Sequence, residues 1–404
     1  MKALLFGVGF LVLLLAEIAR VYYIMPFPGS QADDTIALAY FIQSNLGIIR
    51  LIGVALMGYP LYQYFKAGSR KTKVVVGLLL VVYIVVFYLF NFQFLADKMF
   101  VQPKNKRLAS IQNSTVSIKQ LVVGVSLQGE ARAYPIEIIG YHHQVRDTVG
   151  GEAIMVTYCT VCRTGRVFSP IVNGQPENFR LVGMDHFNAM FEDSRTRSWW
   201  RQVNGEAIAG KLKGQTLREI PSEQMRLESW IRQHPNTLIL QPDTLFKEEY
   251  DGLKNYDEGK SKSKLTKPDS LSWKEKSWVV GVSLGLYAKA YDWMDLKKHR
   301  VINDEVSGIP LVIALENDTA SFHVWNRIAG QDTLAFVYSD SVKAMIDTKT
   351  HSLWDWSGRC GQGSLKGTQL QTVQSYQEFW HSWKTFHPQT KQFKFADSRQ
   401  PGTE

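Results

Sequence analysis

The stretch VVGVSLQGEARAY at Val122–Tyr134 recurs almost unchanged as VVGVSLGLYAKAY at Val279–Tyr291. The offset of 157 residues continues without a gap through Gly151 and Gly308. Such a long ungapped match indicates that part of the chain is used twice, as expected of duplication followed by divergence.

A second set of matches extends the repeat toward the C-terminus. At an offset of 153, the tripeptide LKG recurs at 212–214 and 365–367, and His234-Pro235 matches His387-Pro388. We therefore predict a first module at 115–242, a linker at 243–276 and a second, degenerate module at 277–397. The linker contains KNYDEGKSKSKLTKPDS, whose charge and serine content is typical of an exposed connection.

Each module alternates short apolar runs with turn residues. Hairpins are predicted around Gln128–Glu130, around Gly150-Gly151 and around Asn173-Gly174. Short helices are predicted at 136–143 and at Ser222–Pro235, followed by a strand. This pattern predicts an α+β fold with a mainly antiparallel sheet in each module, after N-terminal transmembrane helices.

Residues 1–98 are predicted to form a membrane domain of three transmembrane helices, at 4–24, 48–65 and 74–96. Each apolar segment is long enough to cross a hydrocarbon layer about 30 Å thick. The first could instead be a signal peptide, but Glu17 stands where cleavage after Ala19 needs a small residue, so a retained anchor is favoured. Glu17 and Arg20 are expected to pair, and Arg50 is expected to extend to the interface.

The basic loop between the second and third helices sets the predicted orientation. It carries Lys66, Arg70, Lys71 and Lys73, which places it in the cytoplasm by the positive-inside rule. The N-terminus is then cytoplasmic, and the modules are periplasmic or extracellular, at a cell membrane that is predicted to be a bacterial inner membrane. The lipid bilayer is the predicted partner. The net charge of +9 is spread along the chain without a nucleic-acid-binding pattern, so no nucleic acid is expected.

The chain has three cysteines, and two of them form a Cys-x-x-Cys motif at Cys159 and Cys162. The motif follows a predicted strand and opens no helix, unlike a thioredoxin-type site. This placement favours a metal knuckle, for copper or zinc, or a short-loop disulfide. A closed zinc site needs further ligands, for which His142 and Cys360 are the candidates, with His143 and His186 behind them.

The second module bears on the role of His142. It keeps His299 at the matching position, but Glu316 and Thr319 replace the cysteine pair. Ligand and structural roles therefore both stay open for His142.

Two segments resemble a known family. YPIEIIGYHHQVRDTVGGEAIMVTYCTVCRTGRVF at Tyr134–Phe168 and DSRTRSWWRQVNGEAIAGKLKG at Asp193–Gly214 are similar to the signature of the family called domain of unknown function 3179. The chain departs from that signature at Arg146, where asparagine is usual, and at Val161-Cys162-Arg163, where the family tends to Leu-Cys-Gly. The resemblance implies a fold unit and a site to inspect, with no established activity.

Three classes of function remain, and no catalytic residue is predicted for any of them. The first is metal or cofactor binding through Cys159 and Cys162. The second is thiol redox exchange by the same pair. The third is a non-enzymatic interaction or scaffold module in which the pair is structural.

Overall fold

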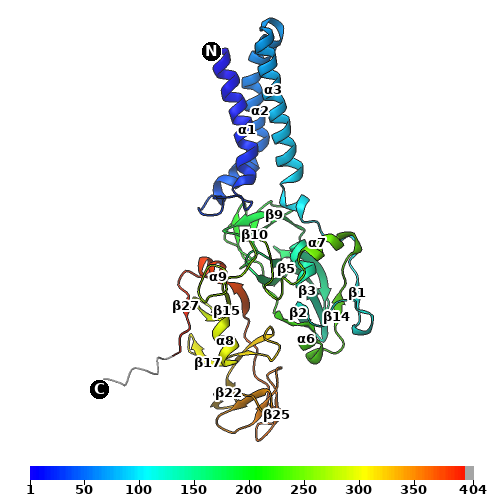
Figure 1. Cartoon of the computed structure of the whole chain (residues 1–404), viewed down its shortest axis with the longest axis vertical. Helices are drawn as coiled ribbons and strands as arrows, with labels where there is room; N and C mark the ends of the chain where they lie inside the picture. Colours follow the sequence, from blue (N-terminus) through cyan, green and yellow to red (C-terminus); the bar gives the residue numbers. More distant parts are fainter. Residues whose placement is uncertain (396–404) are drawn as a thin grey trace, which may run out of the picture. The chain divides into compact units, whose positions relative to one another are not determined.

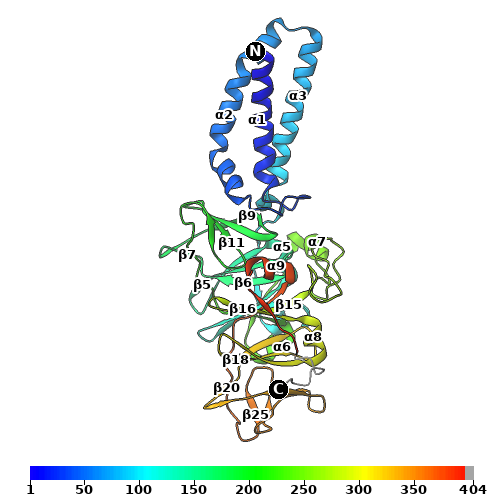
Figure 2. The same ribbon diagram turned by 90° about the vertical axis from the view of Figure 1, so that its left-hand side faces the viewer.

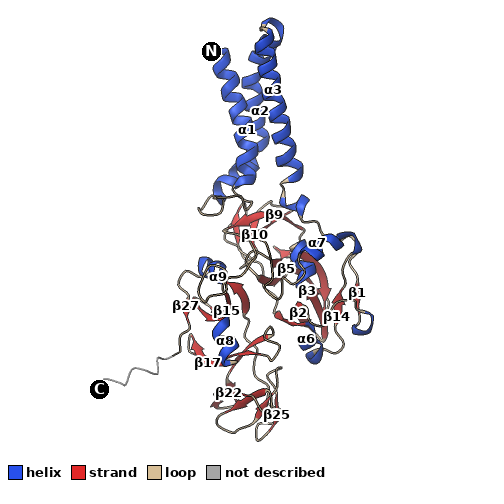
Figure 3. Cartoon of the chain, viewed as in Figure 1, coloured by secondary structure: helices blue, strands red, loops and turns tan. Residues whose placement is uncertain are grey.

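The computed structural model describes residues 1–395 and shows an α+β fold (Figures 1 and 3). The chain forms two compact units, one of residues 1–102 and 170–218, the other of residues 103–169 together with the chain from 219 onward. Long apolar helices mark the first unit, and mainly antiparallel sheets with short helices build the second. The end of the predicted second module, residues 396 and 397, lies outside the described residues.

Three long helices confirm the predicted apolar segments. They are α1 (Lys2–Tyr22), α2 (Ile36–Ala67) and α3 (Arg70–Tyr88), and the π-helix η1 (Leu89–Gln93) extends α3. They lie side by side (Figure 2), and each is long and apolar enough to cross a membrane, which indicates membrane association. Helix α2 begins well before the predicted residue 48, because the polar run Gln43–Asn45 lowers the hydropathy without ending the helix.

The charged residues of these helices pair more extensively than expected. The predicted pair of Glu17 and Arg20 is confirmed, with 3.2 Å between Arg20 Nε and Glu17 Oε2. Arg50 does not simply extend to the interface, because its Nε lies 2.6 Å from Glu17 Oε1. Glu17 is buried between the helices, and the two guanidinium groups compensate the charge of its carboxylate there.

The first unit also contains a four-stranded antiparallel sheet and a small hairpin. The sheet has the order β12-β11-β10-β9. Its strands are β9 (Phe179–Asp185), β10 (Asn188–Asp193), β11 (Trp199–Arg201) and β12 (Ala207–Ala209). The hairpin predicted at Asn173-Gly174 is confirmed, but its strands are only β7 (Ile171–Val172) and β8 (Gln175–Pro176), because the following residues pair within the larger sheet.

The second unit opens with a five-stranded sheet of order β1-β14-β3-β2-β13. Its strands are β1 (Leu108–Ala109), β2 (Leu121–Leu127), β3 (Glu130–Pro135), β13 (Glu223–Arg226) and β14 (Leu238–Leu240). The predicted hairpin of β2 and β3 and the predicted helix, α5 (Ile136–His142), are confirmed. A three-stranded sheet follows, made of β4 (Gln144–Val149), β5 (Glu152–Cys159) and β6 (Thr164–Phe168).

From β15 onward, the second unit again begins with a hairpin, a short helix and a three-stranded sheet. The hairpin of β15 (Trp278–Leu284) and β16 (Tyr287–Asp292) leads into α8 (Trp293–His299). A three-stranded sheet and a two-stranded hairpin come next: β17 (Val301–Val306), β18 (Ile309–Leu315), β19 (Phe322–Asn326), β20 (Ile328–Ala329) and β21 (Asp332–Thr333). A four-stranded sheet and the closing elements are β22 (Phe336–Ser339), β23 (Ala344–Asp347), β24 (Leu353–Trp354), β25 (Cys360–Gln362), β26 (Tyr376–Phe379), α9 (Trp380–Phe386) and β27 (Lys391–Gln392).

The same side-chain contacts occur at matching positions of the two sequence halves. Tyr134 Oη donates to Asp147 Oδ2 at 2.8 Å, and Tyr291 Oη donates to Asp304 Oδ2 at 2.9 Å. These aspartates therefore act as internal acceptors for a buried tyrosine.

A second pair of matching aspartates organises a turn before a tryptophan. Asp193 accepts the amides of Thr196 and Ser198 and the indole N–H of Trp200. Asp347 accepts the amides of Thr350 and Ser352 and the indole N–H of Trp354. Both carboxylates thus act as turn and capping groups.

Two segments differ from the sequence-based expectation. The helix predicted from Ser222 begins only at Leu227, as α6 (Leu227–Gln233), because Glu223–Arg226 pairs with β2 as strand β13. The segment 243–276, expected to be an exposed linker, contains η3 (Thr244–Phe246) and α7 (Lys247–Gly252) and buries the rings of Phe246, Tyr250 and Tyr256. Strand pairing and aromatic burial override the local composition in these places.

A glycine in the middle of strand β2, and another in the middle of strand β15, leaves space for a tryptophan ring. A Cβ on Gly281 would overlap the indole of Trp383, and a Cβ on Gly124 would overlap that of Trp230. We expect Gly281→Ala to lower the free energy of unfolding by about 1–3 kcal/mol, because the buried ring has no space to yield.

This effect is measured by unfolding of the full chain in detergent, followed by tryptophan fluorescence, since all 11 tryptophans lie outside the long helices. The control is Gly361→Ala, because nothing lies within 4 Å of a Cβ at that position. Equal stabilities of the two variants would contradict the packing argument.

Candidate functional site

The Cys-x-x-Cys motif forms the turn between β5 and β6. Strand β5 ends at Cys159 and strand β6 begins at Thr164, so the motif follows a strand and opens no helix, as predicted. Cys159 and Cys162 are both fully buried. The turn is held from the other half of the unit, because the amide of Phe379 donates to the carbonyl oxygen of Cys162 at 2.8 Å.

The two thiols meet side by side. A hydrogen bond links Cys162 to Cys159, and no disulfide joins any of the described cysteines. Burial, followed by Cys159 and the carboxylate of Glu378, raises the pKa of Cys162 well above its usual range. Because the thiolate is the nucleophile and the metal ligand, this environment favours the inert thiol form.

Glu378 is the acidic neighbour of the pair. It is fully buried, lies 3.3 Å from Arg166 Nη2, and accepts from Ser382 Oγ at 2.5 Å. Burial raises the pKa of this carboxyl, while Arg166 lowers it in part. Strand β26 and helix α9 therefore place a carboxyl group and an imidazole against the cysteine turn, since His381 Nε2 lies 3.2 Å from the carbonyl oxygen of Val161.

Arg163, directly after the motif, joins three parts of the second unit. Its Nε donates to Gln377 Oε1 at 3.0 Å, and its Nη1 and Nη2 donate to the carbonyl oxygens of Tyr256 and Asp257 at 3.1 and 2.9 Å. The guanidinium also stacks 3.7 Å from the ring centroid of Trp278. Arg163 is only 1% exposed, so these contacts replace its water shell.

The other predicted ligands have partners of their own. His142 Nε2 lies 2.7 Å from the hydroxyl of Tyr250, and His143 Nδ1 lies 2.8 Å from the carbonyl oxygen of Tyr158. Burial lowers the pKa of His143 to about 4, so this ring is neutral at physiological pH.

Cys360 and His186 lie in different sheets. Cys360 belongs to β25, where its thiol donates to the carbonyl oxygen of Gln362 at 3.3 Å. His186 follows β9 and lies 2.7 Å from Asp185, which raises the pKa of the imidazole. Among residues 1–395, no group of three or more His, Cys, Asp or Glu side chains is arranged to hold a metal ion. The structure thus brings Cys159 and Cys162 together without assembling the ligand set of a closed zinc site.

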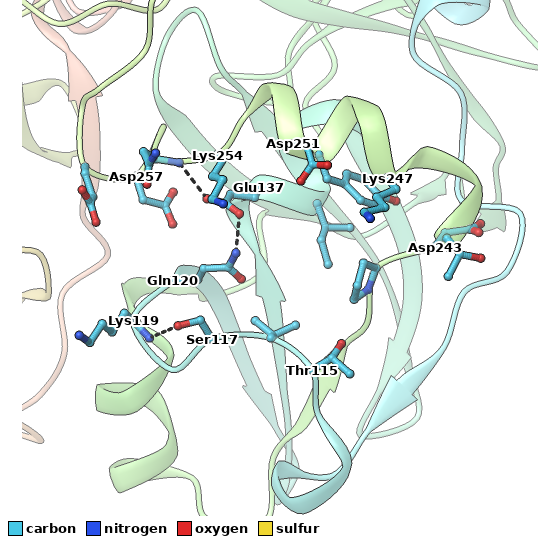
Figure 4. A pocket seen from close by; sticks show the side chains of 17 residues that line it. Thr115, Ser117, Lys119, Gln120, Glu137, Asp243, Lys247, Asp251, Lys254 and Asp257 are labelled. Atoms are coloured by element: carbon cyan, nitrogen blue, oxygen red, sulfur yellow. Dashed lines mark hydrogen bonds between the residues drawn. The ribbon is translucent and has the colours of Figure 1, made fainter.

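A pocket of about 590 Å³ lies in the second unit, beside α5 and α7 (Figure 4). Its acidic lining residues are Glu137, Asp243, Asp251, Asp257 and Glu258, and its lysines are Lys119, Lys247 and Lys254. Val116, Ile138, Pro242 and Tyr250 add apolar surface. A volume of this size suits a small organic ligand.

Asp257 is the most perturbed group of this lining. Its Oδ2 accepts the amide of Leu121 at 2.8 Å, and its buried Oδ1 has no hydrogen-bond partner among the described residues. Burial raises the pKa of Asp257 to about 7, and the nearby charge of Glu137 adds to the rise. Such a carboxyl in a pocket is a candidate binding group.

Glu137 is the second carboxylate of interest. It accepts from Gln120 Nε2, a bond drawn in Figure 4, and from the amide of Asn255 at 3.2 Å. Burial raises its pKa as well. Both carboxylates are held by backbone or amide donors.

Sequence reasoning did not identify this pocket. Many of its lining residues come from the segment 243–276, whose lysines and serines are typical of a solvated linker. Glu137 lies in a short helix in which only the histidines were considered as site residues. The aromatic residues Tyr250 and Tyr256 were the available signal, because rings within a charged segment indicate burial.

Fold and site together define a membrane-associated α+β protein with a buried cysteine turn beside a polar pocket. The chain belongs to the family described as Protein of unknown function (DUF3179), whose model matches residues 102–390. The resemblance seen in the sequence is therefore confirmed. No curated protein and no solved structure matches the chain.

The raised pKa of Asp257 predicts a pH-dependent stability. The folded chain holds the proton of this carboxyl more tightly than the unfolded chain, where the ordinary value is 3.8. Its contribution to the free energy of unfolding is therefore complete below about pH 4 and is lost as the pH rises through about 7. Asp257→Asn should remove this loss and raise the stability at pH 8, by at most about 4 kcal/mol, with little change at pH 4.

Tryptophan-detected unfolding of wild type and variant at the two pH values measures this difference. Asp340→Asn is the control, since Asp340 is 89% exposed and lies outside the pocket. A variant that is destabilised at pH 8 would show that the ionised carboxylate of Asp257 is a stabilising group.

Proposed function

We propose that this protein is a membrane-anchored, non-enzymatic binding module whose pocket takes a small organic cation. The observation that carries the proposal is the buried Oδ1 of Asp257, a pocket carboxylate oxygen with no hydrogen-bond partner among the described residues. A buried acceptor without a donor costs stability, so an N–H donor from a ligand would offset that cost.

The charge of the pocket supports a cationic ligand. Five acidic residues and three lysines line it, which leaves a formal charge of −2 when all are ionised. The lysines are long and flexible, whereas Glu137 and Asp257 are held in place by hydrogen bonds. The apolar lining around Ile138 and Tyr250 favours a ligand with a hydrocarbon or ring body beside its ammonium or guanidinium group.

The cysteine turn is proposed to support the pocket wall. Tyr256 Oη donates to the carbonyl oxygen of Thr160 at 2.8 Å, inside the motif, and Arg163 holds the carbonyl oxygens of Tyr256 and Asp257. The turn between the two cysteines and the residue after it therefore position the segment that carries Asp257. Fully buried thiols with a raised pKa suit such a structural role.

The remaining predictions on organisation and location form part of the same proposal. The basic loop Lys66–Lys73 supports a cytoplasmic N-terminus, with the modules in the periplasm or outside a bacterial inner membrane. The matching contacts of Tyr134 with Asp147 and of Tyr291 with Asp304 support a tandem origin of the modules. The second module, which lacks the Cys-x-x-Cys pair, would serve as packing support for the first.

Matched ligands of one size test the proposed pocket. Benzylamine, benzyl alcohol and benzoate share a ring and differ in charge. At pH 8 we expect only benzylamine to raise the unfolding midpoint of the full chain in detergent, because only its ammonium group complements the Asp257 carboxylate.

Asp257→Asn should abolish the benzylamine effect, and Asp340→Asn should retain it. An equal effect of benzyl alcohol and benzylamine, or no effect of any of the three, would refute a carboxylate-dependent cation site.

A second candidate is dithiol chemistry at Cys159 and Cys162, favoured by the hydrogen bond between the two thiols. Two sulfurs fit the low coordination number of Cu(I), and an adjacent pair can form a disulfide. Metal analysis and thiol titration of anaerobically purified full chain compare wild type with the double variant Cys159→Ser/Cys162→Ser.

Under the structural role we expect no bound metal in either protein and a loss of about 1–3 kcal/mol of stability in the variant. Cys360→Ser controls for loss of a buried thiol elsewhere. Stoichiometric metal lost in the variant would instead establish a metal site, and a reversible disulfide in wild type would establish a redox pair.

A further inference from the structure

Four polar side chains meet between the three long helices. They are Glu17 of α1, its neighbour Arg20, Arg50 of α2 and Asn91 of η1. Asn91 joins them, since its Nδ2 donates to Glu17 Oε2 at 2.9 Å and its Oδ1 accepts from Arg20 and Arg50 at 2.6 and 2.8 Å. Asn91 lies in the π-helical turn η1. Turns of this kind are frequent at functional sites.

The cluster carries one positive charge in excess. Arg20 and Arg50 contribute two positive charges and Glu17 one negative charge. Arg20 is only 3% exposed, and its three guanidinium nitrogens donate to Glu17, Gln43, Asn91 and the carbonyl oxygen of Phe90. Because all three guanidinium nitrogens of Arg20 are engaged within the protein, Arg50 is where an outside anion can balance the excess positive charge.

Arg50 presents part of its guanidinium to the surroundings of the helices. Its Nε and Nη2 donate to Glu17 and Asn91, whereas its Nη1 makes no hydrogen bond with residues 1–395. The side chain is 31% exposed, and the guanidinium lies 4.9 Å from the ring centroid of Phe87. The Glu17 carboxylate and Asn91 thus engage Nε and Nη2, the ring of Phe87 covers one face of the guanidinium, and the two N–H groups of Nη1 are left for an outside acceptor.

The depth of Arg50 can be estimated along its helix. The N-terminus and the α2–α3 connection lie at the same end of the three helices (Figure 2). With a rise of roughly 1.5 Å per residue, Arg50 lies about 25 Å from Ala67, which ends α2. In a hydrocarbon layer about 30 Å thick, the guanidinium then reaches the headgroup level of the leaflet opposite the basic loop.

We propose that Arg50 forms a binding site for the phosphate group of a membrane phospholipid. The free Nη1 of Arg50 can donate charge-assisted hydrogen bonds to phosphate oxygens, and the phosphate charge balances the excess charge of the cluster. Ile48, Leu51 and Val54 beside Arg50 are 61%, 70% and 58% exposed, so acyl chains have apolar surface on the same helix. This apolar setting favours a lipid-borne phosphate over the free ion.

Native mass spectrometry of the full chain in dodecyl maltoside tests the site with three probes. Dioleoyl phosphatidylglycerol should be retained on the wild type, whereas dioleoylglycerol, with the same chains and no phosphate, should bind at least tenfold more weakly. Inorganic phosphate at millimolar concentration should not displace the phospholipid.

Arg50→Gln should lower the affinity for phosphatidylglycerol at least tenfold, and Lys66→Gln, at the other end of α2, should leave it unchanged. Arg50→Lys serves where Arg50→Gln does not fold, and it should weaken binding about fivefold, because lysine keeps the charge but cannot bond Glu17 and Asn91 and also present a planar N–H group to the phosphate.

Equal retention of the two lipids would overturn the proposal in favour of an apolar groove. Displacement by inorganic phosphate would overturn it in favour of a simple anion site. Unchanged affinity in both Arg50 variants would show that the lipid binds elsewhere.

Discussion

The fold of the second unit depends on keeping the guanidinium of Arg163 satisfied inside the protein. A buried cation without hydrogen bonds is prohibitively costly, so Gln377 and the carbonyl oxygens of Tyr256 and Asp257 have to stay in place together. Arg163 also has a φ of +58°, a conformation that favours glycine, which is the residue the family tends to have there. Its contacts offset that backbone cost, and they tie the cysteine turn to both the connecting segment and the second half of the chain.

This arrangement explains why one pair of cysteines is buried in a setting that disfavours the thiolate form. The turn that carries them is covered by β26 and α9, and Glu378 adds a negative environment in which thiolates are disfavoured. Arg163, directly after this turn, also holds the carbonyl oxygens of Tyr256 and Asp257 in the segment that lines the pocket. The raised pKa of Asp257 and its unmatched carboxylate oxygen are the two observations on which the proposed cation site rests.

In the long apolar helices, too, a buried charged side chain has to be surrounded by hydrogen-bonding partners. Glu17 is buried between them because two guanidinium groups and Asn91 surround it, and the excess positive charge appears where Arg50 meets the lipid. Pocket and helix cluster are thus both defined by a charged group that the protein itself does not fully balance. Each marks a position where a molecule of opposite charge has a physical reason to bind.

The sequence by itself determined the elements that depend on local periodicity and turn chemistry: the three apolar helices, the β2–β3 and β4–β5 hairpins, helix α5 and the strand before Cys159. It also predicted the family and the pairing of Glu17 with Arg20, because residues three apart share a helix face. Only the tertiary structure decided that Glu223–Arg226 is a strand, that the segment around Tyr256 is buried, and that His142 meets Tyr250. Those outcomes depend on partners about a hundred residues away along the chain, and the free energy of such contacts leaves no local pattern in the sequence.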